Sequence, residues 1–233
     1  LVFKYNDSIN GTDDQPPPMW MSRPVEYDIV LGVDLGASSS KPTTAICLVA
    51  YSHKISNTVW MLESRSLSTA TPSHVAAVIQ EYSSKYNVTK IVCDAGALGK
   101  GYVEEFRQRY GLPVEPARKQ DKLGYIKLMN GDFEQSRIKV IRSTNSQLID
   151  GYKRIIWADD GKDIGKGQDD HVQEAALYAW REAKHWMAEE DMPRFAYGTD
   201  EWMSQEEQKM LDVQSDLFKQ REAIYDFMHQ FEF

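Results

Sequence analysis

The sequence has little cysteine, and its two cysteines are too few and wrongly placed to build a zinc site. Cys47 and Cys93 both lie inside apolar runs that are typical of strands, where a free thiol packs as a small hydrophobic group. We therefore expect two buried, reduced thiols, which is the usual state of cysteine in a cytosolic compartment.

Long apolar runs are also missing. No stretch of about 18 apolar residues is present, so we expect no membrane-spanning helix. The N-terminal region is polar, with three prolines at 16–18, and shows no signal peptide. A Gly-x-x-x-x-Gly-Lys-Ser/Thr loop is absent as well, so the 233 residues carry no P-loop for nucleotide binding. The first residue is Leu rather than Met, which suggests a piece of a longer chain.

The net charge of −8 argues at first sight against a nucleic-acid-binding protein. The charge is unevenly distributed, however: residues 181–233 carry 6 Lys or Arg against 13 Asp or Glu, whereas residues 100–170 carry 14 against 12. The second region could contact a phosphate backbone, or it could be a solvated surface of mixed charge. The candidates for DNA contact are Lys100, Arg118, Lys119, Lys122, Lys162 and Lys166.

The apolar periodicity predicts a mixed α/β domain. Three strands over 28–36, 43–51 and 58–64 are joined by short polar connections, which suits antiparallel hairpins. Residues 137–141 could form a strand or a buried connector. The other expected elements are a helix from Pro72, strands at 90–94 and 113–117, and helices at 101–110, 119–135, 145–157 and from Asp169 or Asp170 to about 188. This order is compatible with an RNase H-like fold, in which the first and fourth strands are parallel neighbours.

The chain is expected to divide into three parts. Residues 1–26 show no period and are rich in Gly, Asn, Asp and Pro, so we interpret them as a linker. Residues 27–190 form the α/β domain. Residues 191–233 form an acidic tail, within which residues 204–229 have the spacing of an amphipathic helix that a partner or the core could bury.

Acidic side chains stand at three places where a metal site is expected. Asp34 ends the first strand, Asp94 ends the fourth, and the pair Asp169–Asp170 precedes the last apolar helix. A carboxylate at the end of a buried strand lies at the sheet edge where open α/β sheets place their ligands. Carboxylate oxygens suit Mg²⁺ and Mn²⁺. Three such sites in one crevice would suit a two-metal phosphodiesterase, with Asp34 as the bridging ligand.

The third site leaves a choice between two neighbouring acids. We favour Asp170 as the ligand, because it stands four residues before Glu174 and shares a helix face with it. Asp169 would then be an N-cap, or it would contact the ligand residue without binding the metal itself. His171 could orient a water molecule or contact the leaving group. The ordinary alternative is that each acid is only a turn residue or a helix cap.

Three segments together resemble a known family. They are Leu31–Gly36, Ile91–Asp94 and Gln168–Ala179, and the resemblance spans roughly residues 28–190. The chain resembles the nuclease domain of the large terminase subunit of tailed bacteriophages, a member of the RNase H-like superfamily. The resemblance implies a sheet of three antiparallel strands followed by helix-linked parallel strands, flanked by helices. One departure is Glu174, where the family often has Asp, so its role as an accessory ligand is open.

The resemblance also implies an activity and its partners. The protein would be a metal-dependent endodeoxyribonuclease that holds two Mg²⁺ or Mn²⁺ ions with Asp34, Asp94 and one of Asp169 and Asp170. It would cut double-stranded viral DNA during genome packaging in the host cytoplasm, and it would be absent from the mature virion. Its partners would be an upstream ATPase domain, the portal and the small terminase subunit, with no role for a membrane.

Three alternative interpretations remain at this point. Residues 32–41 also resemble the first phosphate-binding hairpin of sugar kinases in the actin-like superfamily, although a second such hairpin is missing. A Holliday-junction-resolvase-like nuclease would share the fold. A docking module with a degenerate nuclease core would explain the acidic tail without any catalysis. DNA cleavage with Mn²⁺ that is lost with EDTA would separate an enzyme from a docking module.

Overall fold

The structure is a computed structural model that describes residues 1–16, 27–36, 43–52, 58–94, 99–159, 161, 164–165 and 167–183, without the side chains of residues 99 and 100. The chain divides into two compact units, Leu1–Met187 and Ala188–Phe233. All described elements belong to the first unit. The helix predicted over 204–229 lies outside the described residues.

Three antiparallel strands form the centre of a seven-stranded sheet. They are β2 (Asp28–Leu35), β3 (Thr43–Tyr51) and β4 (Val59–Ser68), and the strand order is β1-β7-β4-β3-β2-β5-β6. The three predicted hairpin strands are therefore confirmed. The last of them is longer than predicted, because the polar end of β4 continues to pair with β3, as far as Thr43 and Ser68.

The remaining strands are parallel to their neighbours. β5 (Lys90–Cys93) pairs with β2, β6 (Val114–Pro116) pairs with β5 at one edge, and β7 (Ile138–Ile141) pairs with β4. The side-by-side placement of the first and fourth predicted strands is thus confirmed. The open choice at residues 137–141 is settled in favour of a strand.

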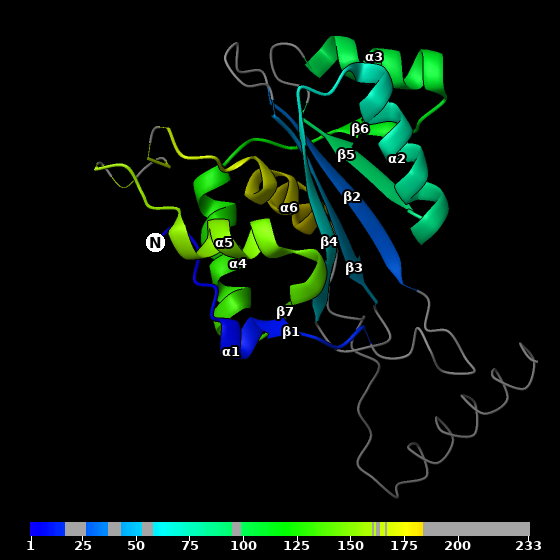
Figure 1. Ribbon diagram of the computed structural model, residues 1–233. Coiled ribbons are helices and arrows are strands. Elements are labelled where there is room, and N and C mark those ends of the chain that lie inside the picture. The colour runs from blue at the N-terminus through cyan, green and yellow to red at the C-terminus, as the bar shows by residue number, and fades with distance from the viewer. Residues whose placement is uncertain are drawn as a thin grey trace, which may run out of the picture. The chain divides into compact units, whose positions relative to one another are not determined.

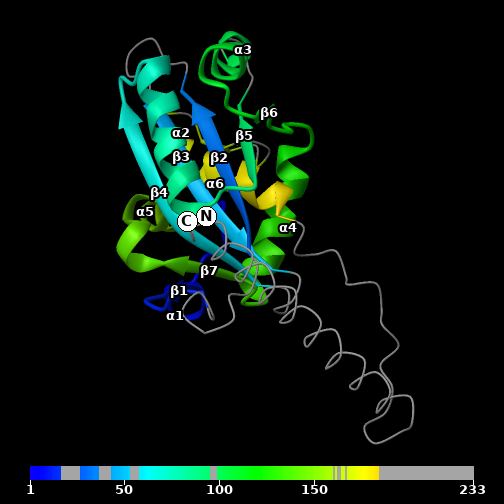
Figure 2. The same cartoon turned by 90° about the vertical axis from the view of Figure 1, so that its right-hand side faces the viewer.

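Helices cover both faces of the sheet (Figure 1). α4 (Lys122–Glu134), α5 (Ser146–Arg154) and α6 (His171–Glu182) pack on one face, and α2 (Pro72–Tyr86) and α3 (Gly99–Tyr110) on the other. Figure 2 looks onto the α2 and α3 side, with α6 behind the strands. Two hydrophobic cores result, and Cys47 and Cys93 are buried free thiols, as predicted. No helix among the described residues is long and apolar enough to cross a membrane.

The close contact between α6 and β2 depends on small residues. Gly32 lies beneath α6, and a Cβ atom added to it would stand 2.0 Å from the Ala175 carbonyl oxygen and 3.0 Å from the Ala179 Cβ. Because Gly32 has no side chain and α6 presents alanines, the helix can rest directly on the strand. These small residues thus allow α6 to lie close to β2.

The prediction that residues 1–26 form a linker is wrong for the part that the structure describes. α1 (Asp7–Asn10) and β1 (Gly11–Thr12) belong to the fold, and β1 pairs in parallel with β7. Val2 and Phe3 are buried, and the Phe3 ring packs 4.8 Å from that of Tyr152. The buried Asn10 amide donates hydrogen bonds to the carbonyl oxygens of two residues distant in sequence, Phe133 and Ile138. The segment is held by these long-range contacts, which its own sequence does not reveal.

Candidate functional site

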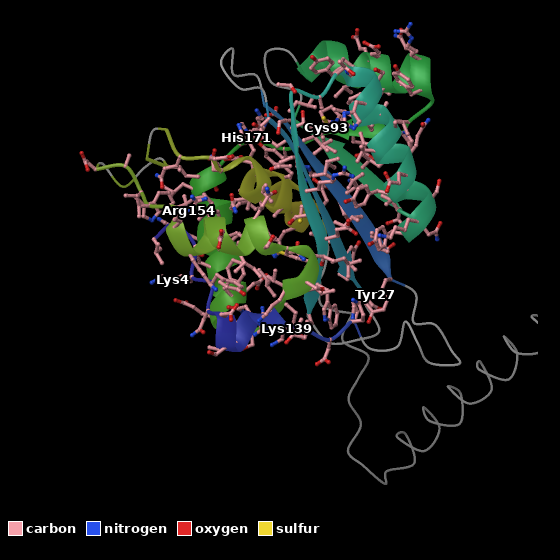
Figure 3. The ribbon with its side chains drawn as sticks, viewed as in Figure 1. Lys4, Tyr27, Cys93, Lys139, Arg154 and His171 are labelled. Atoms are coloured by element: carbon pink, nitrogen blue, oxygen red, sulfur yellow. The ribbon has the colours of Figure 1, made fainter. Side chains whose placement is uncertain are left out.

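Two of the predicted acids lie side by side at the ends of parallel strands. Val33 pairs with Cys93, and the Asp94 amide donates a hydrogen bond to the Val33 carbonyl oxygen at 2.9 Å. Side chains alternate between the two faces of a strand. Val33 and Cys93 belong to the core beneath α2 and α3, so Asp34 and Asp94 turn toward α6. Figure 3 labels Cys93 and His171 near the same end of the sheet.

The third acidic site lies at the start of α6. Asp170 occupies the N-cap position, but its side chain makes no capping hydrogen bond and instead lines the cavity described below. The sequence leaves the cap open between Asp169 and Asp170, and the structure places Asp170 at that position. Asp169 is exposed and does not line the cavity. Glu174 follows Asp170 by one helical turn and faces the same way, as the four-residue spacing predicts.

These side chains surround one cavity of about 390 Å³. It is lined by Asp34, Asp94, Lys119, Lys122, Asp170, His171, Glu174, Leu177, Tyr178 and Arg181. The fold therefore brings together acids from the ends of β2 and β5 and from the start of α6. It also brings in Lys119, from the segment before α4, and Lys122, the first residue of α4.

Asp34 is the most deeply buried acid of the cavity, with only 5% of its surface exposed. Burial raises the pKa of its carboxyl group to about 6, and the neighbouring Glu174 and Asp94 add to this rise. His171 Nδ1 lies 2.7 Å from Asp34 Oδ2, and this hydrogen bond raises the pKa of the imidazole. Burial and the neighbouring acids thus disfavour the ionised form of Asp34, and the hydrogen bond to His171 orients its carboxyl group.

The other acids of the cavity are paired with lysines. Lys119 Nζ lies 2.5 Å from Asp94 Oδ1. Lys122 Nζ lies 3.8 Å from Asp170 Oδ2 and forms a second ion pair with Glu174. Burial raises the pKa of Asp170, and the charge of Glu174 raises it further. The carboxylates therefore repel one another and are held together by cations from the chain itself.

The chemistry of these donors fits a hard divalent cation. Four carboxylates meet at one cavity, and oxygen ligands of this kind are those that Mg²⁺ and Mn²⁺ prefer. In the described ranges, no group of three or more His, Cys, Asp or Glu side chains is already arranged to hold a metal ion. Three of the four carboxylates, those of Asp94, Asp170 and Glu174, are paired with Lys119 or Lys122 instead.

Only some of the residues predicted to contact DNA are seen to line the cavity. Lys119 and Lys122 line the cavity. Arg118 lies beside them but points outward, with 69% of its side chain exposed and its Nε 3.5 Å from Glu182 Oε1. Lys162 and Lys166 lie outside the described residues, and so does the side chain of Lys100.

Three residues of the cavity are missing from the sequence-based prediction: Leu177, Tyr178 and Arg181. All three lie on the helix face that begins with Asp170 and Glu174, at spacings that repeat with the helical period. Extending that period along α6 would have found them. Burial raises the pKa of the Tyr178 hydroxyl far above its ordinary value, and the neighbouring acids add to this effect.

Comparison with known proteins identifies relatives in sequence and in structure. The family model of the terminase RNaseH-like domain matches residues 31–189. No curated protein matches the chain in sequence. Among solved structures, one large terminase from a thermophilic bacteriophage is similar with a TM-score of 0.60 at 15% identity. The similarity covers 76% of this chain and 44% of that one, so this chain spans less than half the length of that large terminase.

Two isolated nuclease domains are similar as well. The large terminase nuclease domain of bacteriophage SPP1, solved with bound Mn, has a TM-score of 0.53 at 15% identity and covers 66% of this chain and 85% of its own. The large terminase nuclease of thermophilic phage G20c, solved with bound cobalt, has a TM-score of 0.53 at 16% identity and covers 67% and 82%. At these identities, the likeness establishes the fold.

Proposed function

The chain belongs to the terminase RNaseH-like domain family, and from that membership we propose that it is the nuclease part of a large terminase. In this proposal, it is a metal-dependent endonuclease that cuts double-stranded viral DNA during genome packaging. One observation carries the proposal: Asp34, Asp94 and Asp170 come from three separate elements and line one cavity at the ends of the parallel strands β2 and β5. Acids that only ended strands or capped helices would not need to converge.

Asp34, Asp94 and Asp170 are the residues that would hold two Mg²⁺ or Mn²⁺ ions, with Glu174 as an accessory ligand. Two divalent ions bound by such a set supply an activated water and neutralise charge on the leaving oxygen of a phosphodiester. The bound Mn and cobalt of the SPP1 and G20c nuclease structures support the use of divalent cations. Asp169, which is exposed, has no role as a ligand in this proposal.

The chain's own side chains would prepare the site for this chemistry. His171 donates a hydrogen bond to Asp34 and so fixes the direction in which that carboxylate points. Lys119, with 47% of its side chain exposed, and Arg118 stand at the rim, where they can meet phosphate oxygens of DNA. Contacts of this kind carry no sequence information, so we expect cleavage with little sequence preference and binding that weakens steeply with salt.

The wider context is also part of the proposal. The chain spans less than half of the similar large terminase from a thermophilic bacteriophage, which is consistent with an ATPase domain elsewhere in the whole protein. The portal, the small terminase subunit and double-stranded DNA are the partners that we propose, with the host cytoplasm as the place of action. Family membership argues against the sugar kinase and resolvase alternatives.

Plasmid nicking tests the proposed activity. In Mn²⁺, the wild-type protein should nick supercoiled DNA, and EDTA should stop the reaction. Asp34→Asn should lower the rate by at least about 1,000-fold, because a carboxylate that would hold the metal ions is lost. Asp28→Asn is the matched control, since it makes the same change at the opposite end of β2, and it should cleave at close to the wild-type rate.

The melting temperatures of both variants should be measured beside the rates. A loss of cleavage in Asp34→Asn with a folded protein supports the proposal. A folded Asp34→Asn protein that still cleaves at the wild-type rate would contradict it. A folded wild-type protein that neither binds Mn²⁺ nor cleaves would favour the docking-module alternative.

A further inference from the structure

Lys119 and Lys122 point into the acidic cavity rather than away from it. Lys119 Nζ reaches Asp94 Oδ1 at 2.5 Å, and Lys122 bridges Asp170 and Glu174. Long, flexible lysine side chains at a surface normally extend into water, because an exposed ion pair returns little free energy. Two lysines from one short segment, both directed at the same acidic group, therefore call for a structural cause.

The cause is a backbone segment that α6 holds in place. Arg181, only 8% exposed, donates hydrogen bonds to the carbonyl oxygens of Arg118 and of Gln120, the latter at 3.0 Å. Its guanidinium group also lies 3.5 Å from the centre of the Tyr125 ring. The planar fork of an arginine can bind two carbonyl groups at once, whereas a lysine cannot do so in the same geometry. The backbone on both sides of Lys119 is thereby fixed to the helix that carries the acids.

The turn into α4 fixes the second lysine. Asp121 adopts the left-handed conformation with φ of 54°, and its side chain accepts a hydrogen bond from the Gly124 amide at 3.1 Å. A Cβ atom on Gly124 would stand 2.2 Å from Asp121 Oδ2, so a larger residue there would displace the Asp121 carboxylate. Lys122 is the first residue of α4 and is directed at α6 by this geometry. Both ammonium groups are thus positioned by the fold.

We propose that Lys119 and Lys122 are built-in counter-ions of the acidic cavity, which compete with divalent cations for its carboxylates. This inference rests on the proposed function, since it concerns the cations that the acids would bind. A carboxylate that faces an ammonium group cannot offer the same oxygen to a metal ion, and the two cations repel each other. The lysines stabilise the clustered acids without a metal, and a metal ion must displace them.

Lysines that a metal ion displaces from the acids become available to bind another anion. Once the acids are occupied by divalent cations, the two ammonium groups remain tethered beside the cavity by Arg181 and by the turn at Asp121. Phosphate oxygens of DNA are the anions that they can then contact. The same two side chains would thus link occupation of the acids to attraction of the DNA backbone.

Calorimetric titration with Mn²⁺ tests the inference without measuring catalysis. The double variant Lys119→Met and Lys122→Met removes both charges while keeping much of the side-chain length. It should bind Mn²⁺ about tenfold more tightly than wild type, because two partly exposed competing charges are gone. The matched control is Lys127→Met, an exposed lysine on the same helix as Lys122 that does not line the cavity. It should leave the affinity within about twofold of wild type.

Two further variants keep the test decisive. Lys119→Arg with Lys122→Arg retains both charges and should bind Mn²⁺ within about threefold of wild type. If the double Met variant does not fold, Lys119→Met alone should tighten Mn²⁺ binding by about threefold. The metal-free double Met variant should also melt at a lower temperature than wild type and gain more from added Mn²⁺, since a ligand stabilises in proportion to its affinity.

The outcomes separate the two proposals. Tighter Mn²⁺ binding in the Met variants, with unchanged binding in Lys127→Met, supports the counter-ion role. Normal wild-type binding with equal or weaker binding in the Met variants would overturn this inference and leave the proposed function intact. A wild-type protein that binds no Mn²⁺ would overturn the proposed function and this inference together.

Discussion

Glu63 and Asp34 are both carboxylates on central strands of the same sheet, yet their surroundings have opposite effects. Glu63, on β4, is surrounded by donors from α2: it accepts hydrogen bonds from the Tyr82 hydroxyl at 2.7 Å, from Lys85 at 3.2 Å and from Tyr86. Burial alone would raise the pKa of Glu63, but these three hydrogen bonds outweigh it and lower the pKa. Asp34 accepts a hydrogen bond from His171, and its pKa is raised.

The difference separates an acid that supports the fold from one that is available for chemistry. Glu63 accepts hydrogen bonds from two neutral hydroxyls and a lysine, and these donors lower its pKa. Asp34 stands among other acids, and its burial and their charge both oppose its ionisation. An arrangement of this second kind weakens the fold by itself and is typical of a functional site.

The largest effect on stability should come from breaking the contact that assembles the acidic cavity. Gly32→Ala puts a Cβ atom 2.0 Å from the Ala175 carbonyl oxygen, so α6 has to move away from β2. We expect the free energy of unfolding to fall by about 3 kcal/mol and Mn²⁺-dependent cleavage to fall with it. Urea denaturation and plasmid nicking measure the two effects.

Gly131→Ala is the matched control for this substitution. Gly131 lies within α4, and a Cβ atom on it would meet nothing within 4 Å. Alanine should therefore stabilise the helix, by up to about 1 kcal/mol, and leave cleavage unchanged. Equal stability of Gly32→Ala and wild type would show that the contact between α6 and β2 does not position the site.

A smaller effect on stability is expected from a substitution of Glu63. Glu63→Gln should lower the free energy of unfolding at neutral pH by about 1 kcal/mol, because charge-assisted hydrogen bonds at a partly exposed position are replaced by neutral ones. Cleavage should stay within about twofold of wild type, since Glu63 does not line the cavity. Glu81→Gln, an exposed change on α2, should alter neither quantity.

The contribution of Glu63 should also depend on pH in a defined direction. A lowered folded-state pKa stabilises the protein above the ordinary value of 4.5, and this contribution is lost as the pH falls below that value. The gap in unfolding free energy between wild type and Glu63→Gln should therefore close on acidification. A gap that widened below pH 4.5 would show that Glu63 does not gain stability from its donors.

Much of this arrangement could be predicted from the sequence, because it depends on local patterns. The apolar runs that end at Asp34 and Asp94 predict two strands, and the order of elements is compatible with an RNase H-like fold, in which these two strands are parallel neighbours. The four-residue spacing of Asp170 and Glu174 predicts a shared helix face. Each of these inferences uses only the period of a strand or a helix and the order of elements.

The remainder depends on contacts between residues far apart in the sequence. Lys119 faces inward because Arg181 binds the backbone at Arg118 and Gln120, more than 60 residues earlier. The N-terminal segment joins the fold through residues such as Asn10, whose partners lie more than 120 residues away. Neither contact leaves a periodic signal, so the sequence predicts DNA contacts or a solvated surface for the lysines and a linker for the N-terminal segment.

Anomalous diffraction from crystals grown with Mn²⁺ tests the central claim most directly. The account predicts two Mn²⁺ peaks about 4 Å apart in the cavity, with Asp34, Asp94 and Asp170 as ligands. It also predicts that Lys119 and Lys122 have withdrawn from these acids, while Glu63 keeps its hydrogen bonds to Tyr82 and Tyr86. Peaks coordinated by other residues, or a cavity without Mn²⁺ in which both lysines keep their ion pairs, would contradict the account.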